Sequence, residues 1–325
     1  MAFIHRRAFV TASAAFALPP SFARAQTPVA NNRGWGMLTR ANRDAAYNNN
    51  ALQVTKRIPL SGSPNLVQVT PDGKRMYVSI NLRWDVVSSF PELHAEPSGG
   101  LDIIDTASFE KIKTISIPGG IHDMYITPDG KYVVAGANRN KVPQCKCGIS
   151  APTHLGYVFD TQTNEVAWTF SMTPAASPMA ISKKADGSSD KIYAQNDLNG
   201  FRVVDFDTHV VSSFIPLPDI PPSLQNPRVN SHGIGITSDQ KTLLVNSMRN
   251  GALYAYSLPD LKLLGGAALS GRGAQWLVIT PDDKTVYVAN SETNNVSVVD
   301  IATMKETAVI PVGFAPSRNT MWVAP

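Results

Sequence analysis

The stretch of residues 276–313 carries four short runs rich in β-branched residues. The runs occupy residues 277–280, 285–289, 295–300 and 307–312. Pro, Asp, Asn or Gly stands between consecutive runs, where an antiparallel chain has to reverse direction. The pattern therefore predicts a four-stranded antiparallel meander. A single meander of this size cannot bury both of its faces, so we expect the chain to contain further copies.

The first run recurs along the chain, and its recurrences define a repeat. The matching segments end at residues 70, 127, 182, 237, 280 and 324, which are 57, 55, 55, 43 and 44 residues apart. Six first strands indicate six structural units.

A short turn sequence follows most of these first strands. It reads PDGK at residues 71–74 and 128–131, PDDK at 281–284 and SDQK at 238–241. Pro favours the second position of a type I turn, Asp bonds its own backbone, and Gly accepts the positive φ that returns the chain to the ladder. The sequence therefore predicts a tight turn between the first and second strands.

Together with these turns, the motifs YVAN (287–290), VVDxxT (298–303) and IPVG (310–313) resemble the YVTN-repeat β-propeller family. The resemblance covers nearly all of the chain after residue 25. It implies an all-β fold, and with six repeats we expect a six-bladed β-propeller of four-stranded antiparallel blades.

The two chain ends are expected to share the last blade. The segment at residues 321–324 matches a first strand, and strands two to four are predicted at 36–40, 45–48 and 55–60. A ring closed by one strand from the C-terminus and three from the N-terminus would leave no exposed sheet edge.

The first 25 residues have the composition of a cleaved export signal. Arg6 and Arg7 precede an apolar run over residues 8–18, and Ala23-Arg24-Ala25 offers a small-x-small cleavage site. The paired arginines match the twin-arginine motif in part. We therefore expect residues 26–325 to form a single β-propeller domain in a periplasmic or secreted protein.

Charge and hydropathy exclude two classes of partner. The chain has 29 Lys and Arg against 25 Asp and Glu, and removing Arg6, Arg7 and Arg24 leaves 26 against 25. A nearly neutral mature protein lacks the concentrated basic surface that nucleic acid requires. No run approaches the roughly 18 apolar residues of a membrane span.

The loops between strands two and three, and between strand four and the next sheet, leave each sheet at the same end, here called the upper end. Three long segments, residues 82–99, 139–156 and 216–231, all belong to this end. Long loops on a rigid scaffold often carry binding residues. Tolerated surface insertions are the alternative interpretation.

Polar residues occur where each first strand enters the predicted central channel. Five residues before the repeat positions stand Asn65, His122, Ser177, His232, Gln275 and Asn319. A polar ring at this place indicates a hydrated or ligand-filled channel mouth. We take Asn65, Gln275 and Asn319 as candidate ligand-binding residues.

Arginines concentrate at the predicted upper end, whereas the turns at the opposite end use lysine. The upper-end arginines are Arg43, Arg83, Arg139, Arg228, Arg249, Arg272 and Arg318. Arginine pairs with carboxylate or phosphate through two parallel bonds. The sequence therefore predicts binding of a small polar or anionic molecule, or of an exported partner protein, with Arg139, Arg228, Arg272 and Arg318 among the contacts. Singly solvated rim arginines are the alternative.

A second hypothesis is an enzyme that uses the same mouth. His122 and His232 could act as acid, base or metal ligands, which would suit an oxidoreductase, lyase or hydrolase. Cys145, Cys147 and His154 could add ligands for copper or zinc. A local disulfide between Cys145 and Cys147 is the competing interpretation for an exported protein. His209 is expected to be a solvated residue of a lower-end turn.

Overall fold

The computed structural model describes residues 8–11, 57–83, 99–117, 120–137, 155–172, 178–195, 199–226 and 232–321. Within these residues the fold is all-β, and its helical element is the 3₁₀ turn η3 (Pro222–Leu224). None of the described helices has the length and apolar character needed to cross a membrane. The chain divides into two compact units, one of residues 18–126 and 137–153, the other of residues 1–17, 127–136 and 154–325.

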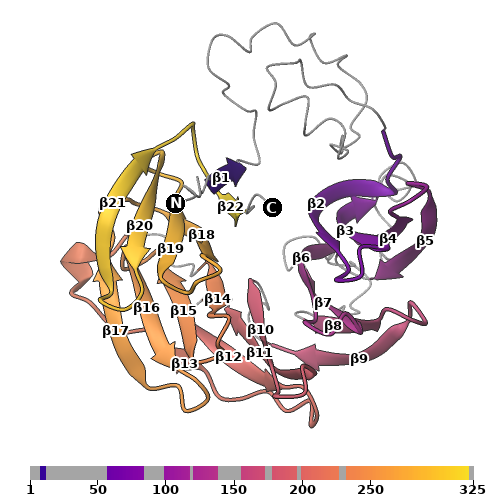
Figure 1. Cartoon of the computed structure of the whole chain (residues 1–325), viewed down its shortest axis with the longest axis horizontal. Helices are drawn as coiled ribbons and strands as arrows, with labels where there is room; N and C mark the ends of the chain where they lie inside the picture. Colours follow the sequence, from indigo (N-terminus) through magenta and orange to yellow (C-terminus); the bar gives the residue numbers. More distant parts are fainter. Residues whose placement is uncertain are drawn as a thin grey trace, which may run out of the picture. The chain divides into compact units, whose positions relative to one another are not determined.

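Five four-stranded antiparallel sheets follow one another in chain order (Figure 1). The first contains β2 (Gly62–Val69), β3 (Arg75–Arg83), β4 (Gly99–Asp105) and β5 (Lys111–Ile117). The second contains β6 (Ile121–Ile126), β7 (Tyr132–Ala137), β8 (Leu155–Asp160) and β9 (Val166–Ser171). The third contains β10 (Met179–Lys183), β11 (Ser189–Gln195), β12 (Gly200–Asp205) and β13 (Ile215–Pro216). The fourth contains β14 (Ile234–Ile236), β15 (Thr242–Ser247), β16 (Ala252–Ser257) and β17 (Leu263–Ala268). The fifth contains β18 (Ala274–Ile279), β19 (Thr285–Asn290), β20 (Asn295–Asp300) and β21 (Lys305–Pro311).

The predicted meander is confirmed strand by strand in the β18–β21 sheet. Its strand order is sequential, and each predicted run overlaps the strand found there, with at most one residue beyond the end of that strand. The repeat positions at residues 70, 127, 182, 237 and 280 all stand at or next to the end of a first strand. Sequence periodicity therefore located five sheets correctly.

The predicted sixth unit is not seen as a four-stranded sheet in the described residues. Its expected first strand, at residues 321–324, overlaps β22 (Arg318–Met321) at Met321, and β22 pairs antiparallel with β1 (Ala8–Thr11), which was not expected. An edge strand carries unpaired backbone groups that can accept any extended segment. Two of the expected partner strands lie outside the described residues. In the third, residues 57–60 form only a single bridge at Arg57 before the chain enters β2.

The turn after each first strand is held by a buried hydroxyl. Thr237, 3% exposed, donates from Oγ1 to Asp239 Oδ1 at 2.7 Å and accepts the N–H of Thr242 at 3.0 Å. Asp239 Oδ1 also accepts the N–H of Lys241 at 3.0 Å. The same contacts recur around Thr70 and Thr127, so the predicted turns are confirmed. The third turn position has positive φ even where it is Gln240 (62°) or Asp283 (53°).

The turn between the third and fourth strands depends on an aspartate. In the β20–β21 turn, Asp300 Oδ1 accepts the N–H and the hydroxyl of Thr303 at 2.8 and 2.7 Å. Asp105, Asp160 and Asp205 make the equivalent bonds in their own turns. Hydrogen bonds from the residue three positions later lower the pKa of all four aspartates.

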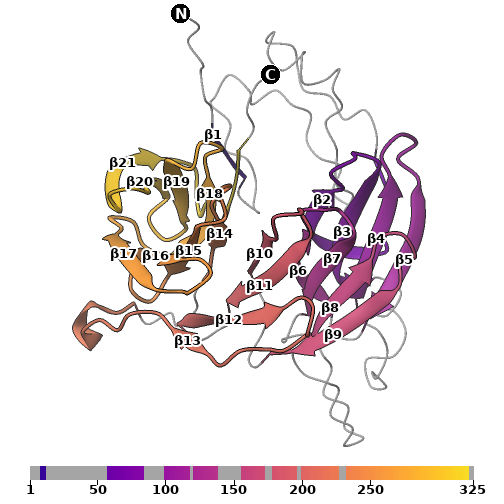
Figure 2. The same cartoon turned by 60° about the horizontal axis from the view of Figure 1, so that its bottom comes forward.

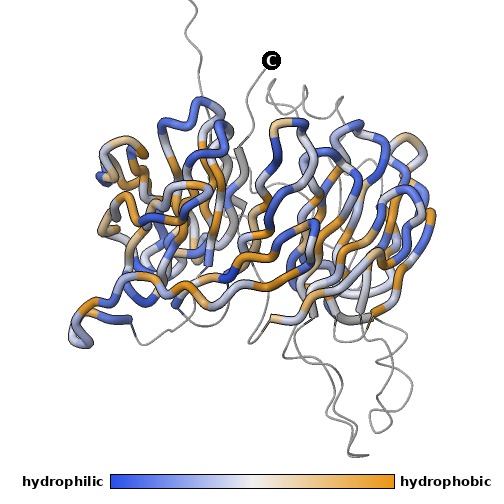
Figure 3. The backbone as a smooth tube through the Cα atoms, turned by 90° about the horizontal axis from the view of Figure 1, so that it is seen from below, coloured by the Kyte–Doolittle hydropathy of each residue, from blue (hydrophilic) through white to orange (hydrophobic). Residues whose placement is uncertain are grey.

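Apolar side chains fill the space between neighbouring sheets of the larger unit. Phe201 of β12 meets Tyr256 of β16 edge to face, with ring centroids 5.4 Å apart. Figure 3 shows hydrophobic residues along the strands and hydrophilic residues at many of the turns. The sheets are therefore joined face to face by buried apolar contacts.

Buried amides also join consecutive sheets. Gln195, at the end of β11, donates from Nε2 to the carbonyl of Gly233 at 3.3 Å, just before β14. Asn246 of β15 donates from Nδ2 to the carbonyl of Gln275 in β18 at 2.7 Å. Both side chains are fully buried, so these bonds fix the axial position of each sheet against the next.

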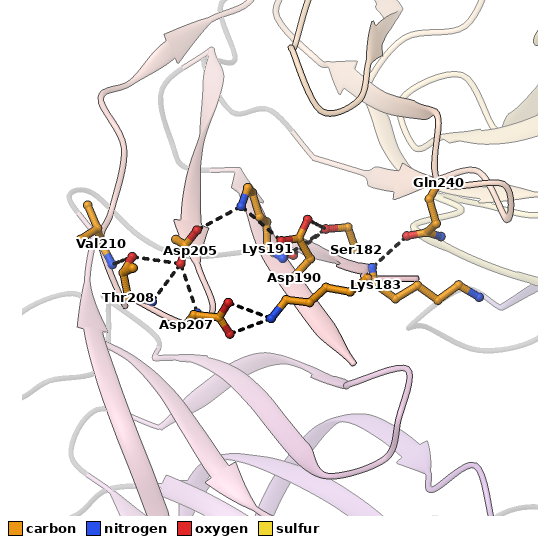
Figure 4. A network of polar contacts seen from close by, with 10 residues as sticks. Ser182, Lys183, Asp190, Lys191, Asp205, Asp207, Thr208, Val210 and Gln240 are labelled. Atoms are coloured by element: carbon orange, nitrogen blue, oxygen red, sulfur yellow. Dashed lines mark hydrogen bonds and ion pairs between the residues drawn. The ribbon is translucent and has the colours of Figure 1, made fainter. Parts of the chain in front are cut away.

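The lower end of the β10–β13 sheet carries a network of ion pairs (Figure 4). Lys191 Nζ lies 3.2 Å from Asp190 Oδ1 and 3.0 Å from Asp205 Oδ2. The N–H of Lys183 donates to Gln240 Oε1 at 3.0 Å, which ties this sheet to the next turn along the chain. Because these charges are paired with each other, the network serves to hold the turns together.

We predict that Thr237→Val lowers the free energy of unfolding by about 1–3 kcal/mol, because it leaves a buried N–H without its acceptor. Urea denaturation measures this change. Thr307→Val is the matched control, since Thr307 is exposed on β21 and should alter stability by less than about 0.5 kcal/mol. Equal effects of the two substitutions would contradict the role of the buried hydroxyl.

We also predict that stability declines as the pH falls below about 4, the ordinary value for a carboxyl group. The four turn aspartates have lowered pKa values in the folded state, so their contribution is complete above that pH and is lost as they become protonated. Melting temperatures recorded between neutral and acidic pH measure the loss. The double variant Asp205→Asn/Asp300→Asn should show a shallower acid dependence than the unsubstituted protein. An unchanged acid dependence would exclude these turns as its source.

Candidate functional site

A groove of about 640 Å³ lies at the upper end of the β14–β17 and β18–β21 sheets. Three loop segments line it, residues 223–226, 248–251 and 268–272, together with Glu292. The first belongs to the long segment that the sequence placed at this end. The other two are the β15–β16 and β17–β18 connections. The groove is therefore formed by the class of loop that we expected to carry binding residues.

The long segment is anchored on the β15–β16 loop. Arg249 donates from Nε and Nη2 to Gln225 Oε1 at 2.9 and 2.7 Å. Its own carbonyl accepts the N–H of Asn226 at 2.8 Å. Asn250 donates from Nδ2 to the carbonyl of Pro218 at 2.7 Å. Figure 2 shows the chain after β13 running beside the β14–β17 sheet, where these contacts hold it.

The β19–β20 loop forms the opposite wall of the groove. Asn226 donates from Nδ2 to Glu292 Oε2 at 3.1 Å, which links the long segment to this loop. The N–H of Arg272 donates to Thr293 Oγ1 at 3.0 Å, and the N–H of Glu292 to the carbonyl of Arg272 at 3.1 Å. The groove walls are thus fixed by bonds between loops of two sheets.

Two guanidinium groups and one carboxylate give the groove its charge. Arg249 is half-buried, and the acceptor of its two bonds is the neutral amide of Gln225, so that contact leaves its positive charge uncancelled. Arg272 is exposed at the rim. The groove can therefore attract an anionic group while Glu292 provides an acceptor for a donor on the same molecule.

The predicted polar ring is engaged in hydrogen bonds within the protein. Asn65 donates from Nδ2 to the carbonyl of His122, and Asn319 from Nδ2 to the carbonyl of Tyr287 at 3.1 Å. Gln275 donates from Nε2 to Ser291 Oγ at 3.3 Å. These amides therefore join neighbouring strands, and their role in ligand binding stays a prediction.

The two candidate catalytic histidines belong to different compact units. His122 Nδ1 lies 3.3 Å from Oδ2 of the buried Asp123. His232 meets the ring of Trp276 edge to face at 5.2 Å. A site shared by the two histidines stays a prediction.

Several predicted site residues lie outside the described residues. They are Arg139, Cys145, Cys147, His154, Ser177 and Arg228. Arg318 is described as part of the backbone of β22 only. Within the described ranges, no group of three or more His, Cys, Asp or Glu side chains is arranged to hold a metal ion. The copper or zinc prediction therefore gains no support from this part of the chain.

Gln225, Asn250 and Glu292 line the groove but were not predicted from the sequence. The available signal was that all three residues lie in upper-end loops. The repeat pattern does not predict which side chains pair across the groove. His209 also differs from expectation. It is exposed, as predicted, yet its ring stacks on Trp168 with centroids 4.0 Å apart.

Comparison with known proteins bears on the fold. No protein-family model matches the sequence, and no curated protein matches it. Hydrazine synthase from Kuenenia stuttgartiensis is similar in structure, with a TM-score of 0.55 at 19% identity over 76% of this chain and 74% of that chain. The WD40 repeats of RRP9 give a TM-score of 0.56 at 13% identity over 78% of this chain. This chain spans 64% of that structure, less than two thirds. At such identities the likeness shows the fold alone, which is of the β-propeller type.

We predict that Gln225→Ala increases hydrogen exchange of the Asn226 amide at least about tenfold, because bonds to a charged group contribute about 1.5–3 kcal/mol. Exchange measured by NMR or mass spectrometry reports the loosening of the long segment. Ser270→Ala is the control, since Ser270 also lines the groove but bonds Glu306 instead of this segment. Faster exchange in both variants, or in neither, would contradict the proposed anchor.

Proposed function

We propose that this chain is an exported protein that binds a small polar or anionic molecule at the upper end of its sheets. The observation that carries the proposal is the groove of about 640 Å³ with Arg249 and Arg272 in its lining. Ligand sites commonly have volumes of about 300–1,000 Å³ and a few fixed polar groups. The groove meets both conditions.

Two features of the groove favour an anion, and a third restricts where it can bind. The guanidinium of Arg249 is held in place by Gln225 and is shielded from full hydration, which strengthens its attraction for a carboxylate or phosphate. Arg272 adds a second positive charge at the rim. Glu292 opposes an anion at its own position, so the ligand would place its negative group away from that wall.

The rigidity of the groove supports binding as its function. Its walls are joined through the Arg249–Gln225, Asn226–Glu292 and Arg272–Thr293 hydrogen bonds. A pre-formed site loses little conformational entropy when a ligand arrives. An exported partner protein that presents an acidic side chain would meet the same groups.

The proposal also includes the number of blades, the type of repeat and the location of the protein. We propose six blades closed by both chain ends, membership of the YVTN-repeat type, and a periplasmic or secreted location after removal of residues 1–25. That removal would take β1 away from β22 and leave the edge of β22 to the strand expected at residues 36–40. An enzyme that uses His122 and His232 with copper or zinc is the alternative function.

We predict that Arg272→Ala weakens binding of a small polyanion about tenfold or more, because a charge-assisted contact is lost. Citrate and inorganic phosphate are suitable probes, and ligand-induced shifts in melting temperature report their affinities. Lys284→Ala removes the same charge from the lower end of the same sheet and should leave the affinity unchanged. Equal losses in the two variants, or no binding by the unsubstituted protein, would contradict the groove as the site.

A further inference from the structure

A second cavity, of about 800 Å³, lies between the β10–β13 sheet and the β14–β17 sheet. Its walls are mainly apolar, from Phe214 and Leu217 on one side and from Tyr256, Leu261 and Leu263 on the other. Its polar lining residues are Asn199, Asp219 and Arg249. Asn199 and Arg249 belong to upper-end loops, whereas Leu261 lies in the lower-end turn between β16 and β17. The cavity therefore has a polar upper part and an apolar remainder.

The cavity lies beside a fourth strand whose ladder is irregular. Strand β13 has two residues, whereas β5, β9, β17 and β21 have six or seven. Proline stands at positions 216, 218, 221 and 222, and proline has no N–H to donate to a ladder. The ladder is irregular just before this stretch, at residues 212–214, between the isolated Val204–Val211 bridge and the Phe201–Ile215 pair. Phe214, from the irregular part, and Leu217, whose N–H donates to the carbonyl of Asn199 at 2.9 Å, both line the cavity.

The walls of this cavity favour an apolar ligand. Leu263 is 50% exposed although it is a large aliphatic residue. Tyr256 is buried in the same wall, and burial raises its pKa to about 12. A hydrocarbon chain placed against these side chains would remove apolar surface from water on both sides of the contact.

The polar part of the cavity favours a carboxylate. Arg249 uses Nε and Nη2 to hold Gln225, and in the part of the chain described here its Nη1 donates to no other residue. Asn199 accepts the Ser247 hydroxyl at 2.6 Å through Oδ1, which leaves its NH₂ group as a second donor. Asp219 lines the same cavity, but it is exposed, so water screens its repulsion of an anion.

We propose that this cavity binds an amphipathic carboxylate, with its hydrocarbon chain along Phe214, Tyr256 and Leu263 and its carboxylate at Arg249 and Asn199. The site is distinct from the upper-end groove, with which it shares only Arg249. Its failure would leave the proposed function intact, because Arg272 lines the groove and does not line this cavity.

Decanoate is a suitable probe, with isothermal titration calorimetry as the measurement. We expect decanoate to bind, acetate not to bind, and each methylene between octanoate and decanoate to raise the affinity about fourfold. Decanol should bind at least about tenfold more weakly, because it lacks the charge that Arg249 recognises. Arg249→Gln should weaken decanoate and leave decanol unchanged. Binding that is insensitive to chain length or to charge would overturn the proposal.

A matched pair of substitutions tests the location. Leu263→Asp places a negative charge in the apolar wall and should weaken decanoate at least tenfold. Leu264→Asp is the control, because Leu264 is the next residue, is 59% exposed and does not line the cavity. Leu263→Ser repeats the test without a charge and should also weaken binding. Arg272→Ala should leave decanoate binding unchanged. Equal effects of Leu263→Asp and Leu264→Asp, with both proteins folded by circular dichroism, would overturn the assignment.

Discussion

The fold depends on satisfying backbone groups at the point where each first strand turns back. A buried hydroxyl stands there in every four-stranded sheet, at Thr70, Thr127, Ser182, Thr237 and Thr280. Each hydroxyl accepts the backbone N–H that follows the turn, at 3.0 or 3.1 Å. Without it a buried donor would lose its partner at the entry to the second strand, where the register of the whole sheet is set. The strand pairing, the packing of one sheet on the next and the geometry of the upper-end loops all follow from this fixed register.

In this repeated fold, both candidate binding regions lie where one sheet departs from the repeat. The β13 ladder is irregular at residues 212–214, and the proline-rich stretch that begins at Pro216 runs along the cavity and onto the β15–β16 loop. Arg249 lies where the two regions meet, because it lines both the cavity and the groove and also holds Gln225. One stretch of chain, residues 214–226, thus contributes to the lining of both candidate binding regions.

The sequence predicts the repeated parts of this structure far better than the unrepeated ones. Strand positions and turn chemistry follow from local patterns such as Pro-Asp-Gly-Lys, since the residues that make the bonds lie within five positions of one another. The groove depends on pairs such as Arg249 with Gln225 and Asn226 with Glu292, which are 24 and 66 residues apart. No local pattern specifies such pairs. The pairing of β22 with β1 was missed for a related reason, because an open strand edge accepts many extended segments and periodicity does not choose among them.

The two buried amides that donate from one four-stranded sheet to the next both donate toward the C-terminus, and this gives these contacts a polarity. Asn246 in one sheet donates to the carbonyl of Gln275 in the next, and Gln195 donates to the carbonyl of Gly233. Gly233 also receives the backbone N–H of Asn246 at 2.8 Å, so its carbonyl would stay satisfied without the preceding sheet. The buried amide of Asn246 has no such reserve if the following sheet is absent. Truncation that removes the β18–β21 sheet should therefore leave the buried amide of Asn246 without an acceptor, whereas loss of the β10–β13 sheet leaves the carbonyl of Gly233 satisfied.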